Sequence, residues 1–437
     1  MIDLHDFQTS ILDQVEAGFA HQVAFTQQLI RFPSLRGQEH TIQDFLYGAL
    51  AARGLTMDRW TTDPDLIRHH PGYSPVAVDY QNAINVVGSH RPQRETGRSL
   101  ILNGHVDVVP TGPAAMWRHP PFEPHIEGDW LYGRGSGDMK AGLAANLFAL
   151  DAIRRAGFDP AATLHLQSVT EEESTGNGTL SALVRGYRAD AALIPEPEDD
   201  QLVRANVGVI WLKVHLKGKP VHVREAQTGA SAILAAWTII HALQDLEATW
   251  NARKDKYRHF QDQEHPININ IGKIEGGDWA SSVPSWCTLH VRAALYPGVD
   301  PVDAAGELEA AIAAASAKDT FLARHPPEVE YNGFFTQGYI LEEGSAAEAT
   351  LARAFAAVHD GRALQAFVTP GYLDGRVFVL YGDCPCLVYG PLAENIHGVD
   401  ERVHLGSLLR VTKTIALFIA HWCGLEERSP TESAVGS

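Results

Sequence analysis

The chain has 437 residues, of which 45% are hydrophobic and 20% charged, which is the composition of a globular protein long enough for two domains. Its 53 acidic and 35 basic residues give a net charge of −18, which argues against nucleic acid or an anionic membrane as partner, because both require a basic surface. Four cysteines, no signal-like start and no apolar run of about 18 residues predict a cytoplasmic protein that spans no membrane.

The first two hundred residues predict an α/β domain. Helices are expected over 7–30, 39–53 and 140–156, and strands at 85–90, 99–105, 163–169 and 191–196. In the third helix, Leu143, Leu147 and Leu150 recur at helical spacing and form an apolar stripe. The strands are continuous apolar runs, which is typical of a sheet buried on both faces between helices.

From about residue 206 the pattern changes to alternating, half-exposed strands. The expected elements are a strand at 208–218, a helix at 230–250, strands at 267–277 and 285–297, a helix at 301–318 and a strand at 327–332. This β-α-β-β-α-β order predicts a ferredoxin-like unit. We expect residues 206–333 to be inserted into a larger domain formed by 1–205 and 334–437. The larger domain resumes with a helix at 345–358, a strand at 386–390 and a helix at 405–423.

Acidic residues and histidines follow the predicted strands of the larger domain. His105 and Asp107 end one strand, and residues two apart on an extended chain point to the same side. The other positions are three consecutive glutamates, a fourth glutamate, a second histidine, and an aspartate at a helix start: Glu171, Glu172, Glu173, Glu196, His397 and Asp138. Since ligands bind beyond the carboxyl ends of strands in open α/β sheets, we expect these side chains to converge.

Two histidines with several carboxylates are a ligand set for zinc, cobalt or manganese. Asp107, Asp138, Glu172, Glu173 and Glu196 would repel one another unless cations neutralised them. Two divalent ions would bring five negative charges to about −1, so counting charges predicts a two-metal site with a bridging carboxylate. Asp138 follows a glycine-rich turn that permits close backbone approach, which makes it the best candidate for the bridge.

The motifs that carry these residues are NGHVDVVP, YGRGSGDMKAG, TEEESTGNG, IPEPE and ENIHGVDERV. In this order they resemble the co-catalytic zinc hydrolases of the aminoacylase, acetylornithine deacetylase and succinyl-diaminopimelate desuccinylase superfamily, which also contains carboxypeptidases and dipeptidases. The predicted insertion contributes GKPVHVREAQTGASAI and EGGDWASSVP, so the resemblance covers nearly the whole chain. It implies a zinc-peptidase-like mixed sheet flanked by helices, and an inserted domain that serves as a lid and dimerisation unit.

The resemblance also implies the ligands of each metal ion. His105, Asp138 and Glu196 would hold one ion, and Asp138, Glu173 and His397 would hold the other, with zinc most expected. Asp107 would orient the His105 ring, as carboxylates behind metal-bound imidazoles do.

By the same resemblance, Glu172 would be the general base that takes a proton from the attacking water and passes it to the leaving nitrogen. The family usually has Asp-Glu-Glu at this place. Glu171 therefore aligns with the aspartate, although a slip of one residue within the three glutamates stays open.

Four positions of the predicted insertion bear on substrate binding. The resemblance implies that His222 reaches the active site of a partner subunit in a homodimer, where it would stabilise the oxyanion, and that Arg292 grips a substrate carboxylate. Ser281 stands where many relatives have asparagine, and His290 replaces the aspartate of the usual Asp-x-Arg. These departures lie on the substrate side, so they leave the substrate open.

The sequence thus predicts a dinuclear metal amidohydrolase that removes an acyl group from the nitrogen of a small polar metabolite. An N-acyl amino acid, as in acetylornithine deacetylase, is the first choice of substrate. An N-formyl aminopyrimidine of thiamin salvage is the second, because the segment between Trp60 and Val87 resembles that branch of the family. A dipeptidase or carboxypeptidase is the third. A non-catalytic binding protein and a purely structural metal protein are remote alternatives, since a carboxylate-rich ligand set is unlike a closed structural zinc site.

Overall fold

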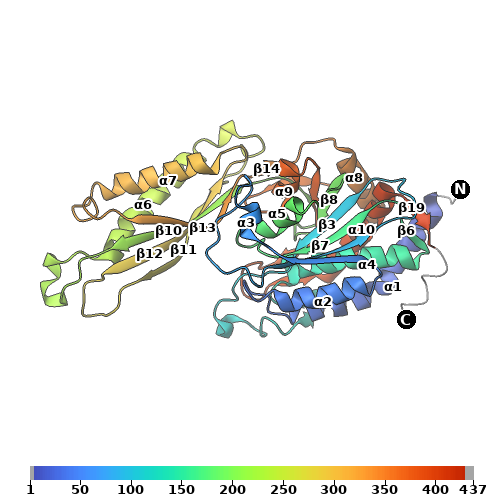
Figure 1. Ribbon diagram of the computed structural model, residues 1–437, viewed down its shortest axis with the longest axis horizontal. Coiled ribbons are helices and arrows are strands. Elements are labelled where there is room, and N and C mark those ends of the chain that lie inside the picture. The colour runs from blue at the N-terminus through green and yellow to red at the C-terminus, as the bar shows by residue number, and fades with distance from the viewer. Residues whose placement is uncertain (1–3, 429–437) are drawn as a thin grey trace.

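The computed structural model describes residues 4–428, which form two lobes joined end to end (Figure 1). The larger lobe contains a mixed sheet between helices, so the predicted fold class is confirmed. Its helices are α1 (Leu4–Ile30), α2 (His40–Ala51), α3 (Pro64–Ile67), α4 (Ala141–Arg155), α5 (Asn177–Val184), α8 (Ala346–Val358), α9 (Gly375–Tyr381) and α10 (Leu405–Cys423). Among the described residues, no helix is long and apolar enough to cross a bilayer.

The central sheet has six strands in the order β1-β2-β7-β3-β8-β16. They are β1 (Thr56–Thr61), β2 (Ile84–His90), β7 (Leu164–Val169), β3 (Leu100–His105), β8 (Ala191–Ile194) and β16 (Cys386–Val388). The last four run parallel, and β1 and β2 are antiparallel to their neighbours. The carboxyl ends of β7, β3, β8 and β16 therefore meet at one edge of the sheet.

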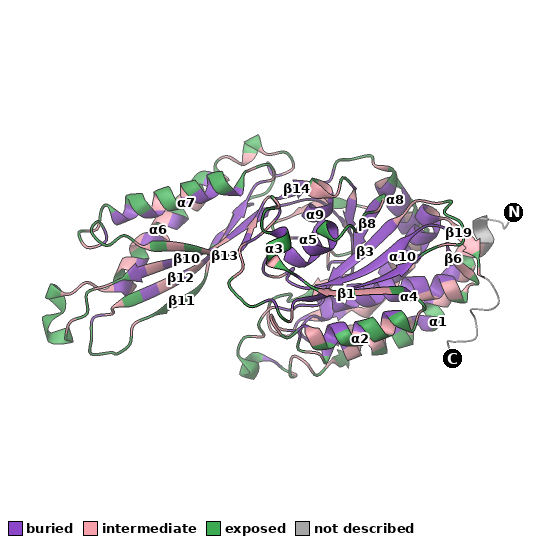
Figure 2. Cartoon of the chain, viewed as in Figure 1, coloured by how far each residue is buried: buried purple, intermediate pink, exposed green. Residues whose placement is uncertain are grey.

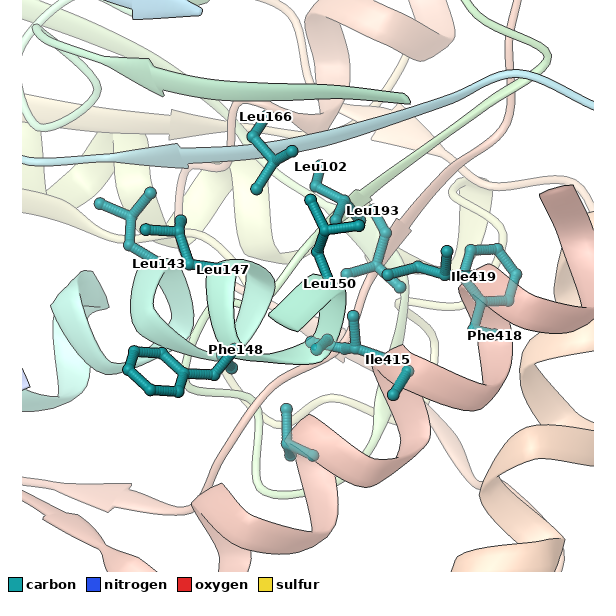
Figure 3. Close-up of a cluster of buried hydrophobic side chains, with 14 of the residues drawn as sticks. Leu102, Leu143, Leu147, Phe148, Leu150, Leu166, Leu193, Ile415, Phe418 and Ile419 are labelled. Carbon is teal, nitrogen blue, oxygen red and sulfur yellow. The ribbon is translucent and has the colours of Figure 1, made fainter. Parts of the chain in front are cut away.

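Both faces of this sheet are buried (Figure 2). Along β3, Leu100 and Leu102 belong to the core that α1, α2, α4 and α10 cover, whereas Ile101 belongs to a core on the opposite face beside α9. Figure 3 shows the first core: leucines of α4 face leucines of the sheet and apolar side chains of α10, namely Leu143, Leu147, Leu150, Leu102, Leu166, Leu193, Ile415, Phe418 and Ile419. The predicted apolar stripe is thus what holds α4 against the sheet.

The smaller lobe, residues 208–336, has its own sheet and its own apolar core. Its elements are β10 (Gly208–Lys217), α6 (Ala232–Asn251), β11 (Ile269–Gly276), β12 (Trp286–Leu295), α7 (Pro301–Ser316) and β13 (Glu328–Thr336), and its sheet order is β11-β12-β10-β13. Burial alternates along β10, because α6 and α7 cover only one face of this sheet (Figure 1). The element order is the predicted β-α-β-β-α-β series, with β13 extending four residues further than expected.

Several short elements of the larger lobe were not predicted. They include β1, α5, α9 and three small sheets. One sheet contains β9 (Leu202–Asn206), β14 (Tyr339–Ile340) and β15 (Ala366–Thr369), and another contains β4 (His125–Glu127), β5 (Trp130–Tyr132), β17 (Ala393–Glu394) and β18 (Arg402–His404). The third pairs β6 (Phe158–Pro160) with β19 (Leu425–Glu427). β9 and β14 matter most for the architecture, because they are the strands by which the chain enters and leaves the smaller lobe.

Candidate metal centre

His105 ends β3 and occupies the centre of the cluster. Its Nδ1–H donates a hydrogen bond to the main-chain oxygen of Asp107 at 3.0 Å, which directs Nε2 toward the carboxylates. Nε2 lies 3.0 Å from Asp138 Oδ1 and 3.5 Å from Glu196 Oε1. Glu172 Oε2 is also near, at 3.7 Å from Nε2. These side chains follow three neighbouring parallel strands and the loop before α4, so the predicted convergence at one sheet edge is observed.

His397 faces the other side of Asp138. Its Nε2 lies 3.2 Å from Asp138 Oδ2 and 3.1 Å from Glu173 Oε2. The two carboxylate oxygens of Asp138 therefore point at two different histidines, which is the arrangement expected of a carboxylate shared by two cations. The His397 side chain is 54% exposed, whereas that of His105 is 1% exposed, so the centre reaches solvent on the His397 side.

The loop that carries Asp138 is held by a buried acid, Glu401, which is not among the residues predicted from the sequence. The Glu401 carboxylate accepts hydrogen bonds from the main-chain N–H groups of Gly135, Gly137 and Asp138 at 3.0, 2.9 and 3.1 Å, and from Arg134 Nη1 at 2.7 Å. Gly135 has φ +79°, a conformation that glycine adopts without strain. Glu401 lies four residues after His397 within a recognised motif, but only the fold shows that it faces this loop.

Asp107 links the two halves of the cluster. Its Oδ1 lies 3.6 Å from His105 Nδ1, and its Oδ2 accepts the main-chain N–H of Glu173 at 3.0 Å. Asp107 thus lies behind the ring of His105, where a carboxylate can fix the orientation of the ring.

The three glutamates after β7 separate by direction. Glu172 and Glu173 face the histidines, whereas the Glu171 carboxylate lies on the other side and is bound by Arg36 and Tyr80. The fold thus brings the second and third glutamate into the cluster and keeps the first one out.

The electrostatics of the centre fit bound cations. Burial raises the pKa of Glu172 and Glu196 well above their usual range, and burial raises that of Asp107 to about 7. Burial alone would lower the pKa of His105, but the charges of Glu196 and Glu172 outweigh it, so this pKa is raised. In the described part of the chain, Glu196 Oε1 and Asp107 Oδ1 are buried without a hydrogen-bond partner.

These groups fit a divalent metal. Ligand atoms of His105, Asp138 and Glu173 lie within 4.8 Å of one another, as do those of His105, Glu172 and Glu196. Buried carboxylates with an unpartnered oxygen are costly unless a cation binds them, and imidazole and carboxylate together suit zinc and related ions.

The three predicted substrate residues lie in the smaller lobe, and their hydrogen bonds are not to this cluster. His222 Nδ1 accepts the main-chain N–H of Arg224 at 3.1 Å, and its backbone forms a β-bridge with Ser282, next to Ser281. Arg292 on β12 donates from Nη2 to the main-chain oxygen of Pro370 in the larger lobe at 3.1 Å. Within residues 4–428 no ion pair of Arg292 is found, and burial lowers its pKa.

Comparison with known proteins agrees with this geometry. A family model described as peptidase family M20/M25/M40 matches residues 101–421. The chain belongs to this family. A relative in Bacillus subtilis (strain 168), N-formyl-4-amino-5-aminomethyl-2-methylpyrimidine deformylase, is 30% identical over 95% of this chain and 97% of its own length. A succinyl-diaminopimelate desuccinylase of Paracidovorax citrulli is 28% identical over 86% of this chain and 91% of its own length.

Two solved dipeptidase structures share the fold at low sequence identity. The dipeptidase Dug1p of Saccharomyces cerevisiae superimposes with a TM-score of 0.77 at 15% identity and covers 97% of this chain and 99% of its own. Human carnosine dipeptidase 1 gives a TM-score of 0.75 at 13% identity, over 95% of this chain and 99% of its own. The predicted family is thus confirmed, and with it the predicted class of enzyme, an M20 hydrolase that acts on amide bonds.

Proposed function

We propose that this M20 protein is a dinuclear metal amidohydrolase that removes a formyl group from the nitrogen of a small aminopyrimidine-like amine. One observation carries the hydrolytic part: the two oxygens of Asp138 lie 3.0 and 3.2 Å from histidines of two separate segments, with Glu172 beside them. The proposed ligands are those expected from the sequence. His105, Asp138 and Glu196 would hold one ion, and Asp138, Glu173 and His397 the other.

Two bound cations, zinc by preference, would neutralise the carboxylates and polarise the scissile carbonyl. The chain's own residues would do the rest. Glu172, buried and with a raised pKa, would accept the proton of the attacking water and deliver it to the departing nitrogen. Asp107 would hold the His105 ring in one tautomer through the two contacts near Nδ1.

For the substrate, the proposal favours the N-formyl aminopyrimidine, the second option from the sequence, over the N-acyl amino acid, the first. The support is the 30% identity with the B. subtilis deformylase over nearly the whole chain. Three aromatic side chains lie together where the lobes meet. The ring centroid of Phe334 is 5.1 Å from that of Trp211 and 4.2 Å from that of Tyr372. Burial raises the pKa of Tyr372, and the charges of Asp374 and of the proposed base Glu172 act in the same direction. Flat aromatic rings suit a heterocyclic amine.

A second candidate is an N-acyl amino acid deacylase, as first predicted. Arg292 favours it. Its side chain is half-buried and, among the described residues, makes no ion pair, so its guanidinium is free to bind a substrate carboxylate. The 28% identity with the desuccinylase points the same way.

We further propose that residues 206–333 form a lid domain through which two chains dimerise, with His222 and Ser281 facing the partner's active site. The supporting observation is apolar surface on this lobe. Its edge strand β11 and its helix α6 carry exposed large hydrophobic side chains, and others lie in the segment before β12 and at its start: Ile274, Leu234, Trp237, Trp279 and Trp286. Exposed apolar groups gathered on one unit are typical of an interface.

The test is amine release by zinc- or cobalt-loaded protein, with Glu172→Gln as the blank. The panel holds the N-formyl aminomethylpyrimidine, its N-acetyl form, N-acetyl and N-succinyl amino acids, and dipeptides. Turnover concentrated on the formyl pyrimidine is the expected result. Turnover confined to substrates with a carboxylate would select the second candidate, and absence of turnover across the panel would contradict both.

A further inference from the structure

The loop between α1 and α2 touches three of the segments that carry the metal centre. Ser34 Oγ donates to the main-chain oxygen of Val106 at 2.7 Å, and Ser34 O accepts the N–H of Val108 at 3.2 Å. Lys140 Nζ donates to the main-chain oxygen of Phe32 at 2.8 Å. Val106 lies between His105 and Asp107, and Lys140 is two residues after Asp138. This loop precedes the part of the chain that the family model matches.

The third contact is an ion pair with the glutamate just before the proposed base. Arg36 Nε and Nη2 each donate to the Glu171 carboxylate at 2.7 Å, a two-point geometry that fixes direction as well as distance. Tyr80 Oη donates to the same carboxylate at 2.6 Å, and Thr175 Oγ1 at 3.0 Å. The Glu171 side chain is 2% exposed, so its charge depends on these donors.

The backbone of Glu171 is held as firmly as its side chain. Its carbonyl oxygen accepts the main-chain N–H groups of Thr175 and Gly176 at 2.9 and 2.7 Å. Its φ is +69°, a left-handed conformation that a residue with a side chain adopts only when its surroundings hold it there. The next two residues in the chain are Glu172 and Glu173. Any movement of Glu171 is therefore passed directly to the proposed base and to a proposed ligand.

From these contacts we infer that residues 32–36 form a brace for the metal centre, and that Arg36 is a positioning residue acting through Glu171. The inference rests on the proposed metal-dependent function. It assigns Arg36 no contact with substrate or metal. The brace keeps the segments of His105, Asp138 and Glu173 at fixed spacing, and the Arg36–Glu171 pair holds the turn whose side chains serve as base and ligand. Partners behind metal ligands commonly change affinity or activity by about 10–100-fold when they are removed.

The test compares Arg36→Met with a matched control, Arg53→Met. Arg53 makes a similar two-point pair, with Nε and Nη2 at 2.9 and 2.7 Å from Asp151 of α4, and both side chains are 17% exposed. Asp151 lies near the end of α4, away from Asp138. The readouts are the two Co²⁺ dissociation constants by competition with a chelator, the visible absorption of bound Co²⁺, kcat and KM separately, and Tm.

We expect both variants to lose thermal stability, but only Arg36→Met to weaken one Co²⁺ site by about 10-fold or more, alter the cobalt spectrum and lower kcat more than KM changes. Equal cobalt constants and kcat in Arg36→Met and Arg53→Met would overturn the inference. Should Arg36→Met fail to fold, Arg36→Lys keeps the charge without the two-point geometry and is judged by the same readouts. Cobalt binding tests the role of Arg36 even if the wild-type chain hydrolyses none of the proposed substrates. Failure of the Arg36 inference can therefore be told apart from failure of the proposed function.

Discussion

At the scale of single residues, the centre depends on side chains that could not remain together without a compensating charge. Asp138 has His105 on one oxygen and His397 on the other, and four further carboxylates lie around it: Asp107, Glu172, Glu173 and Glu196. The raised pKa values of both histidines show how strongly this group attracts positive charge: for His397 the charge of Glu173 is the main cause and the value is about 11. In the proposed enzyme, cations take the place of these protons.

Glu172→Gln tests the assignment of the base. The amide keeps the size of the side chain but cannot accept a proton, so we expect turnover to fall by about 10²–10⁴-fold. Metal content should stay at the wild-type value, because Glu172 is not one of the proposed ligands. Metal content by elemental analysis and kcat on the best substrate of the panel are the measurements. A variant that keeps normal turnover would show that another group is the base.

Local sequence pattern predicted some of the residues in and around the centre but not others. His105, Glu173, Glu196 and His397 were predicted because each follows a strand with a clear apolar pattern, and Asp138 because it stands at the start of such a helix. All five lie in recognised motifs. Glu401 and Arg36 were not found, because what they do depends on partners far along the chain: Arg36 pairs with a residue 135 positions away, and Glu401 bonds a loop more than 260 positions away. No local pattern marks such pairs.

At the scale of elements, clear periodicity predicted well and short or polar segments did not. α4 and α10 carry long apolar stripes, and β3 and β7 are continuous apolar runs, so their limits were within two residues of those observed. β1 is missing from the prediction because its sequence TMDRWT is half exposed at a sheet edge, and its pairing with β2 is what makes it a strand. The small sheets of two to four short strands likewise depend on long-range pairing.

The start of α2 gives a prediction about pH. Glu39 is 1% exposed, and burial together with the charge of Asp107 raises its pKa to about 8. In the unfolded chain this carboxyl has its ordinary pKa near 4.5, so between pH 4.5 and pH 8 the folded chain holds a proton that the unfolded chain has lost. The free energy of unfolding therefore falls as the pH rises through that range. Glu39→Gln does not titrate. We expect the Tm of Glu39→Gln relative to wild type to increase from pH 6 to pH 9.

Thermal unfolding followed by circular dichroism at several pH values would measure this difference. Glu127→Gln, which changes an exposed acid on β4, is the control and should show a constant difference. A difference for Glu39→Gln that does not change with pH would contradict the burial of a neutral Glu39.

At the scale of the whole molecule, the metal centre should contribute to stability without being required for the fold. The two lobes have separate apolar cores, and neither core consists of the cluster residues. We expect a chelator to abolish turnover and to leave most of the far-ultraviolet circular dichroism intact. Returning Zn²⁺ at 100 times its dissociation constant should stabilise the chain by about 2.7 kcal/mol per site. Full turnover in protein shown to lack metal would contradict the proposed function.

The proposed dimer predicts that two inactive variants can restore activity to each other when they share one dimer. Glu172→Gln lacks the base of its own site, and His222→Ala lacks the group proposed to serve the partner's site. Each variant should be inactive by itself, but a mixture allowed to exchange subunits should recover about a quarter of wild-type activity, because half the dimers are mixed and each has one complete site. Light scattering would establish the mass. Two monomeric variants, or a mixture without activity, would contradict the proposal.

The connection between the lobes has a consequence for how the chain can be rearranged. The strands that enter and leave the smaller lobe lie side by side, with Asn206 of β9 paired to Tyr339 of β14. Beside them, a side chain on Gly208 or Gly338 would collide with the backbone of the other strand. Because paired antiparallel residues are only about 5 Å apart, a turn of a few residues could replace the whole smaller lobe without stretching the backbone. The smaller lobe is thus a module that could be removed from, or exchanged in, a continuous catalytic scaffold.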